Sequence, residues 1–262
     1  MHKKALFGIA VSLLLIAVFA VGGVSAEESE KVTYVVGIDG EYPPYSYIDE
    51  KGNPVGFDVE SIQWIAEQKG FEVEIQPTAW DGIVPALQAG KIDLIYSGMS
   101  ITPARAEKVA FSIPYWNVDL AVAVQAGSDV TMDQFNAGDV TIGVQRGCSS
   151  NDWLELHFGT EAYNQMVKDG EIKLFDSFPM SMVALGNGQV EAVIFDDAGI
   201  DEYIVGNDDL VKLGTTDTGE QFAIAVRKDD TELLATLNAG LEELMASDKW
   251  TELKEKYELV EE

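Results

Sequence analysis

The sequence has few of the side chains that build metal sites, disulfides or histidine-dependent catalysts. Its 262 residues include one cysteine, Cys148, and two histidines, His2 and His157. One cysteine cannot form an intramolecular disulfide, so the fold must be stabilised by its hydrophobic cores. Cys148 and His157 cannot build a structural zinc site of the usual kinds, and a Ser-His-Asp arrangement would depend on His157. We therefore expect no metal, no cofactor and no histidine-based catalytic centre.

Basic residues and nucleotide-binding loops are also scarce. The chain has 17 lysines and arginines against 45 aspartates and glutamates, a formal net charge of −28. Such a surface repels phosphates, which excludes nucleic acid as a partner. The sequence has no glycine loop of the P-loop type, so any ATP hydrolysis would belong to a partner protein. The acidity either favours a positively charged small ligand or serves only solubility.

The first 26 residues have the pattern of a secretory signal peptide. The pair Lys3-Lys4 is followed by an apolar segment, residues 6–21, and by the small-x-small cleavage motif Val24-Ser25-Ala26. An uncleaved membrane anchor is the alternative, because no charge falls between Lys3-Lys4 and Glu27. The cleavage point has no cysteine, which argues against a lipid anchor. We predict that residues 1–26 are removed, which brings the net charge to −30 because two lysines are lost, and that the protein is periplasmic or extracellular.

After residue 26 the sequence alternates strand and helix patterns, and no part of it is a low-complexity linker. Such alternation predicts an α/β fold, and 47% apolar residues are enough to form real cores. A 3.6-residue period predicts helices at the C-terminal end, with a break near Ser247-Asp248. The expected strands are 32–38, 72–76, 92–96, 140–145, 172–175 and 192–195, and the expected helices are 57–68, 82–88, 151–158, 179–185, 233–245 and 250–257.

Two segments about a hundred residues apart repeat one scheme. Residues 86–93 (ALQAGKID) and 184–191 (ALGNGQVE) each contain a helix end, a glycine stop and the start of a β-branched strand. Helix–glycine–strand punctuation is common in α/β proteins, but here the likeness extends into the following strand. We therefore predict two similarly built lobes.

The segment Ser97–Arg105 (SGMSITPAR) combines the features of an anion site. It follows an apolar strand, Thr102 suits the N-cap of a helix, and Pro103 suits the first helical position. Backbone N–H groups and the guanidinium of Arg105 should converge at the carboxyl end of that strand. Such a cradle suits a small carboxylate. Taken alone, a single arginine here could equally be a solvated charge or a surface ion pair.

The chain resembles the extracytoplasmic amino-acid-binding proteins of ABC importers, the solute-binding proteins of family 3, over roughly residues 32–257. The resemblance rests on an ordered set of motifs rather than on any one of them. The motifs are Gly37-Ile38-Asp39, Tyr42-Pro43-Pro44-Tyr45, Val55-Gly56-Phe57-Asp58, Trp80 to Leu87, Lys91-Ile92-Asp93, Ser97 to Arg105, Phe111 to Tyr115, Gly143 to Gly147 and Phe222 to Lys228.

That resemblance implies a type II periplasmic-binding-protein fold, with two lobes, two hinge strands and a ligand cleft between the lobes. Lobe 1 would span 27–118 and 217–262, and lobe 2 would span 119–216. The crossings would lie at 119–124 and 214–218. The protein would be a monomer that closes over a polar or basic L-amino acid, such as arginine, lysine or glutamine, and delivers it to a membrane permease.

The resemblance also implies the role of each residue in the cleft. Arg105 would hold the ligand's α-carboxylate with the backbone N–H groups of Ser100 and Ser149, and Asp196 would bind the α-ammonium with the carbonyl of Gly98. Asp197 is the rival for that role, and either aspartate could instead be a helix-start carboxylate. The side-chain subsite would comprise Tyr42 and Trp80 as aromatic walls, Asp39 at the far end, and Ser97 and Gln145 as further contacts.

Two departures from the family pattern bear on the ligand. Cys148 and Ser149 stand where the family often has threonines, which puts hydroxyl contacts in doubt. Arg146 would favour an acidic ligand if it pointed into the cleft, although we expect it to face solvent.

Two other functions remain as alternatives. One is a periplasmic enzyme on the same scaffold, similar to cyclohexadienyl dehydratases, with Asp39 or Asp196 as acid or base. The other is a sensory input module that acts through a partner.

Overall fold

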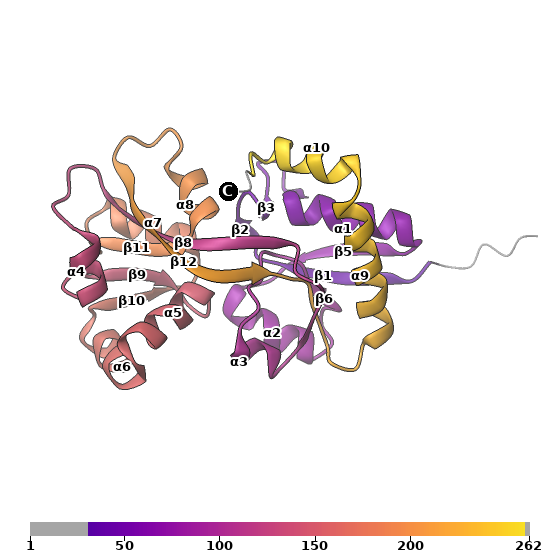
Figure 1. The fold of residues 1–262 in the computed structure, drawn as a ribbon, viewed down its shortest axis with the longest axis horizontal. Helices are drawn as coiled ribbons and strands as arrows, with labels where there is room; N and C mark the ends of the chain where they lie inside the picture. The colour runs from indigo at the N-terminus through magenta and orange to yellow at the C-terminus, as the bar shows by residue number, and fades with distance from the viewer. Residues whose placement is uncertain (1–30, 260–262) are drawn as a thin grey trace, which may run out of the picture. The chain divides into compact units, whose positions relative to one another are not determined.

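The structure is a computed structural model, and it describes residues 31–259. The predicted signal peptide lies outside the described residues. Within them, no helix is long and apolar enough to cross a membrane. Two five-stranded sheets, each accompanied by helices, form the framework (Figure 1).

The first sheet has the strand order β5-β1-β6-β13-β7. Strands β5, β1 and β6 are parallel, and β13 runs antiparallel to both of its neighbours. The strands are β1 (Thr33–Ile38), β5 (Glu72–Pro77), β6 (Leu94–Ile95), β7 (Ala110–Phe111) and β13 (Ala225–Val226). The helices that accompany this sheet are α1 (Phe57–Lys69), α2 (Trp80–Gln88), α3 (Pro103–Ala106), α9 (Thr231–Met245) and α10 (Asp248–Lys256). A small antiparallel sheet is formed by β2 (Glu41–Tyr42), β3 (Ser46–Ile48) and β4 (Pro54–Val55).

The second sheet has the order β10-β9-β11-β8-β12. Strands β10, β9 and β11 are parallel, whereas β8 is antiparallel to β11 and β12. The strands are β8 (Trp116–Gln125), β9 (Ile142–Gln145), β10 (Ile172–Phe175), β11 (Ala192–Asp196) and β12 (Leu210–Phe222). The helices around this sheet are α4 (Met132–Ala137), α5 (Ser149–Phe158), α6 (Thr160–Asp169), α7 (Phe178–Gly186) and α8 (Asp197–Ile204).

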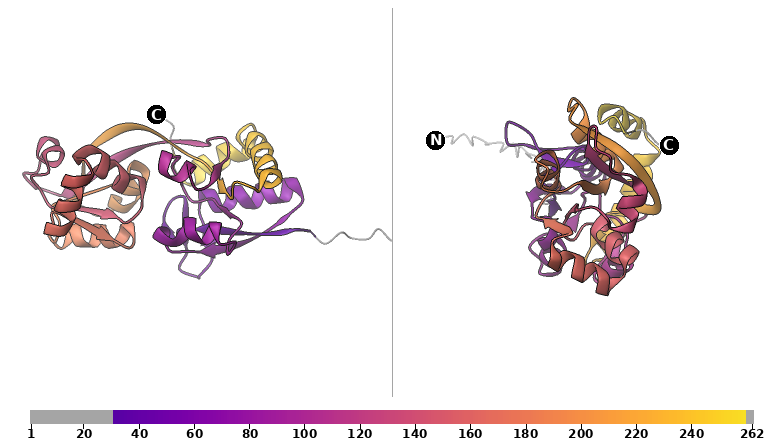
Figure 2. Two further views of the ribbon diagram at one scale, coloured as in Figure 1. Left: turned by 90° about the horizontal axis from the view of Figure 1, so that it is seen from below. Right: turned by 90° about the vertical axis from the view of Figure 1, so that its left-hand side faces the viewer.

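Two long paired strands connect the halves built on these sheets. Strands β8 and β12 pair from Trp116↔Phe222 to Gln125↔Leu210, with two irregularities in register. Both strands belong to the second sheet, and Figure 2 shows them running side by side from it toward the first sheet. Beyond this pair, Ser100 forms an isolated antiparallel bridge with Phe222. The fold is therefore the predicted two-lobed α/β arrangement with two connecting strands.

The predicted internal repeat is confirmed down to its hydrogen bonds. After α2, Gly90 N–H donates to Leu87 O and Lys91 N–H to Ala86 O; after α7, Gly188 N–H donates to Leu185 O and Gln189 N–H to Ala184 O. The two glycines have φ values of +69° and +68°, a region that favours glycine. Each lobe thus uses one helix–glycine–strand unit to lead into a strand near the middle of its sheet.

Most predicted elements are present, with differences at their ends. Helix α2 begins at Trp80 rather than at residue 82, because Gly82 N–H already bonds to the carbonyl of Ala79. The strand expected at 92–96 is reduced to the two residues of β6. Helices α4, α6 and α8, the short strands β2, β3, β4 and β7, and most of β8 and β12 did not emerge from the sequence patterns. The break between α9 and α10 falls where it was predicted, with Ser247 at the N-cap.

The start of α1 depends on Gly56, the glycine of the Gly56-Phe57-Asp58 motif. The first N–H groups of the helix donate to the carbonyls of Pro44 and Tyr45 instead of to a capping side chain. This brings the Tyr45 backbone so close that a Cβ atom on residue 56 would lie 2.2 Å from its carbonyl oxygen. Gly56 also has a φ of +127°, which L side chains rarely adopt.

We predict that Gly56→Ala lowers the free energy of unfolding by about 1–3 kcal/mol, because it combines backbone strain with a backbone clash. Chemical denaturation monitored by circular dichroism measures the change. Gly186→Ala is the matched control: it is the last residue of α7, and its added Cβ meets nothing within 4 Å. The control should be neutral or stabilising by up to ~1 kcal/mol, and equal stability of the two variants would contradict the strain at Gly56.

Candidate functional site

The carboxyl ends of four parallel strands meet at one pocket. Asp39 follows β1, Ser97 follows β6, the segment 146–149 follows β9, and Asp196 ends β11. Ligands of α/β proteins bind at such strand ends. The pocket encloses only about 10 Å³, and its lining residues are Asp39, Tyr42, Trp80, Gly98, Arg105, Gln145, Cys148, Ser149, Phe195 and Asp196.

Eight of the ten residues expected in the cleft line this pocket, and the other two lie behind it. Ser97 Oγ accepts a hydrogen bond from Asp39 N–H at 2.9 Å and contacts Ser46 Oγ at 2.8 Å. Ser100 O accepts a bond from Arg105 Nη1, and Ser100 Oγ donates to Ser149 Oγ at 3.3 Å. Both serines therefore support the pocket residues in this structure.

Arg105 is a buried cation bonded to neutral acceptors. It lies in the single turn of α3, and Thr102 caps this turn by accepting from Arg105 N–H, as predicted. Its side chain is 7% exposed. Nη1 donates to Ser100 O at 2.9 Å and Nη2 to Gly147 O at 3.1 Å, and the guanidinium lies 5.4 Å from the centre of the Trp80 ring. Burial lowers the pKa of Arg105, although an arginine stays protonated.

Arg105 forms no ion pair with a carboxylate among the described residues. None of the ion pairs within residues 31–259 includes Arg105. A buried charge of this kind is costly unless a ligand or a counter-ion pairs with it. The antiparallel bridge to Phe222 also directs the Ser100 N–H and C=O away from β12, since residues of a non-hydrogen-bonded pair point outward. The planar guanidinium of Arg105 and the outward-facing backbone N–H of Ser100 suit a carboxylate.

Asp196 is the buried carboxyl group of the pocket. It is 6% exposed and accepts a hydrogen bond of 2.5 Å from the Tyr42 hydroxyl. Burial raises the pKa of Asp196 to about 7, while the bond from Tyr42 works in the opposite direction. Asp197 occupies a different place: its carboxylate accepts from Ala198 N–H at the start of α8. Of the two rival aspartates, Asp196 is the one in the pocket.

Asp39 and Gln145 meet on another side of the pocket. Gln145 Nε2 donates to Asp39 Oδ2 at 3.0 Å, and Asp39 Oδ1 accepts from Glu41 N–H at 2.9 Å. Burial raises the pKa of Asp39, and the bond from Gln145 partly offsets that effect. One carboxylate oxygen is thus held by the backbone, and the other is shared with an amide that a ligand donor could replace.

The aromatic residues form the remaining walls. Trp80 Nε1 donates to Gly147 O at 3.1 Å, and the Tyr42 ring contacts the Phe195 ring edge-on at 5.3 Å. Phe195 and the carbonyl of Gly147 were not expected from the sequence. Successive side chains of a strand point to opposite faces, so Phe195 and Asp196 lie on opposite faces of β11. Both line the pocket because they stand at the end of the strand.

Cys148 and Arg146 have separate positions. Cys148 lines the pocket, where its thiol donates to Gln145 O at 3.0 Å, and burial raises its pKa to about 12. Arg146 faces solvent, as expected, with its nearest carboxylate oxygen, from Asp176, at 3.8 Å. His157 is exposed, stacks on Trp153 and contacts Asn136 O through Nε2.

The pocket is closed because its two sides bond to each other. Five hydrogen bonds join the half built on the first sheet to the half built on the second. The pairs are Asp39–Gln145, Tyr42–Asp196, Trp80–Gly147, Ser100–Ser149 and Arg105–Gly147. The enclosed space is close to that of one water molecule. A ligand larger than a water molecule can enter only if these contacts separate.

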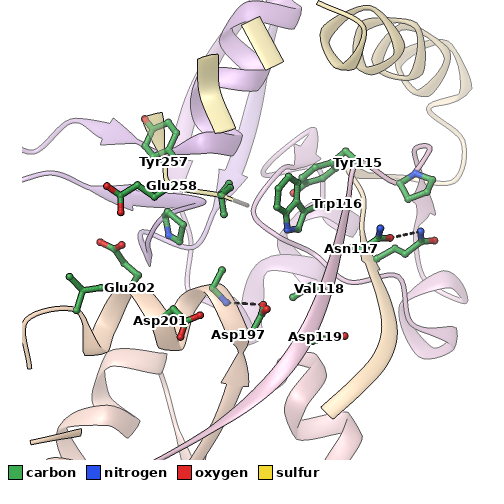
Figure 3. Close-up of a pocket in the computed structure, with 16 residues that line it drawn as sticks. Tyr115, Trp116, Asn117, Val118, Asp119, Asp197, Asp201, Glu202, Tyr257 and Glu258 are labelled. Atoms are coloured by element: carbon green, nitrogen blue, oxygen red, sulfur yellow. Dashed lines mark hydrogen bonds between the residues drawn. The ribbon is translucent and has the colours of Figure 1, made fainter. Parts of the chain in front are cut away.

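A second hollow, of about 590 Å³, lies between β8 and α8 (Figure 3). In Figure 3, Glu202 of α8 points across the hollow toward Glu258, and Asp197 and Asp201 lie further along the same helix. The other residues that line the hollow are Pro44, Pro114, Tyr115, Trp116, Asn117, Val118, Asp119, Ala198, Val205, Gln221, Tyr257 and Leu259. The described lining contains carboxylates but no lysine or arginine, so a ligand carboxylate would have no cationic partner there. Its larger volume therefore does not make it the better candidate.

Comparisons with known proteins identify the family of the chain. The family model of bacterial extracellular solute-binding proteins, family 3, matches residues 34–260. The chain is 29% identical over 263 residues to the L-cystine-binding protein TcyJ of Escherichia coli (strain K12), covering 97% of this chain and 95% of TcyJ. It is 30% identical over 266 residues to the arginine-binding extracellular protein ArtP of Bacillus subtilis (strain 168), covering 97% and 98%.

Solved structures show the same fold. An ancestral arginine-binding protein, with one structure bound to arginine and another bound to glutamine, superimposes with a TM-score of 0.76 and 35% identity, covering 87% of this chain and 98% of that protein. Since the family model covers most of the sequence, the chain belongs to the bacterial extracellular solute-binding proteins of family 3.

Proposed function

We propose that the protein captures an L-amino acid with a basic or polar side chain, with arginine as the first candidate, and delivers it to an ABC importer. The observation that carries this proposal is the convergence of a buried guanidinium, Arg105, and a buried carboxyl group, Asp196, on one pocket. They come from different lobes and are not paired with each other. A zwitterion supplies the opposite charge that each of them lacks.

The head of the ligand would bind between these two groups. Arg105 holds the α-carboxylate, and the N–H groups of Ser100 and Ser149 complete that contact. Asp196 binds the α-ammonium in place of the Tyr42 hydroxyl, together with the carbonyl of Gly98. Both lobes then contact one molecule, so ligand binding favours the closed arrangement.

The side chain of the ligand would extend toward Asp39 and Gln145. A guanidinium or ammonium group can replace the Gln145 amide on Asp39 Oδ2, while a ligand carboxamide can bond to both. The rings of Tyr42 and Trp80 would flank it, and a desolvated ring can contribute ~2 kcal/mol against a cation. Relatives named for arginine, and a related structure with glutamine, support arginine first and glutamine second.

The proposed transport role also covers export, lobe boundaries and a membrane partner. We propose an exported monomer, released by cleavage after residue 26, with lobe 1 at 27–118 and 217–262 and lobe 2 at 119–216. Its partner is the membrane permease of an ABC importer, and it binds its ligand without chemical change. Turnover of arogenate or prephenate would instead support the dehydratase alternative.

Arg105→Ala should weaken arginine binding by about 2–5 kcal/mol, because the ligand carboxylate would be buried without its cation. Isothermal titration calorimetry with arginine, lysine, histidine and glutamine measures the loss, which should be similar for every ligand that binds. Arg146→Ala is the matched control, since Arg146 is exposed and outside the pocket. Unchanged affinity in Arg105→Ala would show that the carboxylate binds elsewhere.

Arginine affinity should fall as the pH decreases below 7. The pKa of Asp196 is about 7, and an ammonium ligand requires the ionised form, so binding at lower pH must displace a proton. The loss approaches tenfold per pH unit at most and levels off above pH 7. Calorimetry from pH 5 to 8 in two buffers of different ionisation enthalpy detects the released proton. Asp196→Asn should bind weakly with a flatter profile, and an unchanged slope would exclude Asp196 as the titrating group.

Asp39→Asn tests the choice of side chain. The variant removes the negative charge at the far end of the site but leaves an acceptor oxygen, so it should weaken arginine binding by at least about tenfold relative to glutamine binding. Competition titrations with the two ligands measure the ratio. An unchanged ratio would place the arginine side chain away from Asp39.

A further inference from the structure

Asp58 lies in the core of the first lobe, behind the binding pocket rather than in its lining. It is the second residue of α1 and the aspartate of the Gly56-Phe57-Asp58 motif. Its side chain is 0% exposed, which is rare for an aspartate. The proposed ligand contacts leave this motif residue without a role.

The contacts of Asp58 lead directly to the binding loop. Its Oδ2 atom accepts a hydrogen bond of 2.6 Å from Gly98 N–H and one of 2.9 Å from the Tyr115 hydroxyl. Gly98 lines the ligand pocket. On its other side a Cβ atom on residue 98 would lie 2.5 Å from Tyr42 Cε1. The backbone of Gly98 is therefore fixed between a pocket wall and the Asp58 carboxyl group.

We propose that Asp58 is a positioning residue for ligand binding: its bond to Gly98 N–H holds the loop Ser97–Ser100 in the geometry that presents the Gly98 carbonyl and the Ser100 N–H to the head of the ligand. This inference rests on the proposed amino-acid site. It also gives two residues of the motif separate roles: Gly56 permits the start of α1, and Asp58 connects α1 to the loop.

The protonation of Asp58 agrees with this arrangement. The titratable groups that face it are Tyr45, Tyr96 and Tyr115, whose pKa values are all raised well above the ordinary value, so they stay neutral around pH 7. Burial without a cationic partner raises the pKa of Asp58 to about 8. Its Oδ1 atom is buried and has no hydrogen-bond partner. A proton on Oδ1 leaves Oδ2 free to accept both bonds.

The binding test compares Asp58→Asn, Asp58→Ala and Ser61→Ala in the full chain. The asparagine oxygen can accept both bonds as the neutral acid does, so its arginine Kd should stay within about threefold. Asp58→Ala should raise the Kd at least about tenfold, because the loop loses its anchor and Gly98 N–H is left unpaired. Ser61 is buried one helical turn away and does not bond to the loop. Ser61→Ala removes a buried hydroxyl that has no hydrogen-bond partner, so it should leave the Kd unchanged.

A second readout needs no ligand. In a ¹⁵N-resolved NMR spectrum the Gly98 amide proton should be shifted downfield and should titrate with a midpoint near pH 8 in the wild type. In Asp58→Asn it should keep its position and stop titrating. The melting temperature of the wild type should also fall relative to Asp58→Asn as the pH rises from 5 to 8, because the unfolded aspartate is ionised there while the folded one is not.

The outcomes separate the two proposals. If the wild type binds none of arginine, lysine, histidine and glutamine, the proposed ligand class fails, while the Gly98 resonance still reports the Asp58 bond. If Asp58→Ala binds as tightly as Ser61→Ala, the positioning role is overturned. If Asp58→Ala does not fold, Asp58→Asn decides: full affinity with a Gly98 resonance moved to the ordinary amide range overturns the proposal, and full affinity with the resonance retained supports it.

Discussion

The site depends on two buried charges that the protein keeps apart. Arg105 is held by carbonyl oxygens and Asp196 by a tyrosine hydroxyl, so neither has an opposite charge in direct contact. Burying such groups costs several kcal/mol each unless a partner repays part of it. A ligand that carries both charges at its head is the partner that satisfies both at once. In the proposed site, selectivity for a zwitterion would follow from the fold rather than from many separate contacts.

The fold produces this arrangement by repeating one design. Each lobe has parallel strands whose carboxyl ends meet at one edge, and β8 and β12 bring these edges face to face. Contacts such as Asp39–Gln145 and Tyr42–Asp196 then form between residues that are distant in the sequence. The same contacts must separate when a ligand enters. Ligand affinity is consequently the difference between the contacts that the ligand makes and those that it replaces.

The sequence predicted local features better than contacts across the cleft. The cap at Thr102, the break at Ser247 and the paired glycine stops were predictable, because each depends on a few neighbouring residues. The pocket residues from Asp39 to Asp196 could be named through the family resemblance, whereas the alternation of strand and helix patterns alone predicted only an α/β fold.

Other features could not be read in advance for physical reasons. Ser97 bonds to Asp39 N–H instead of lining the pocket, which depends on rotamers and not on the order of residues. The carbonyl of Gly147 has no side-chain signature, although both Trp80 and Arg105 bond to it. Most of β12 lacks an alternating apolar pattern, because it is a half-exposed strand defined by its pairing with β8.

The most direct test of the two-charge clamp changes the ligand and leaves the protein intact. Titration calorimetry would compare L-arginine with agmatine, which lacks the carboxylate, and with 5-guanidinopentanoate, which lacks the ammonium group. The clamp predicts that each analogue binds at least about a hundredfold more weakly than arginine, since each leaves one buried charge unpaired. Binding of either analogue as tightly as L-arginine would contradict it.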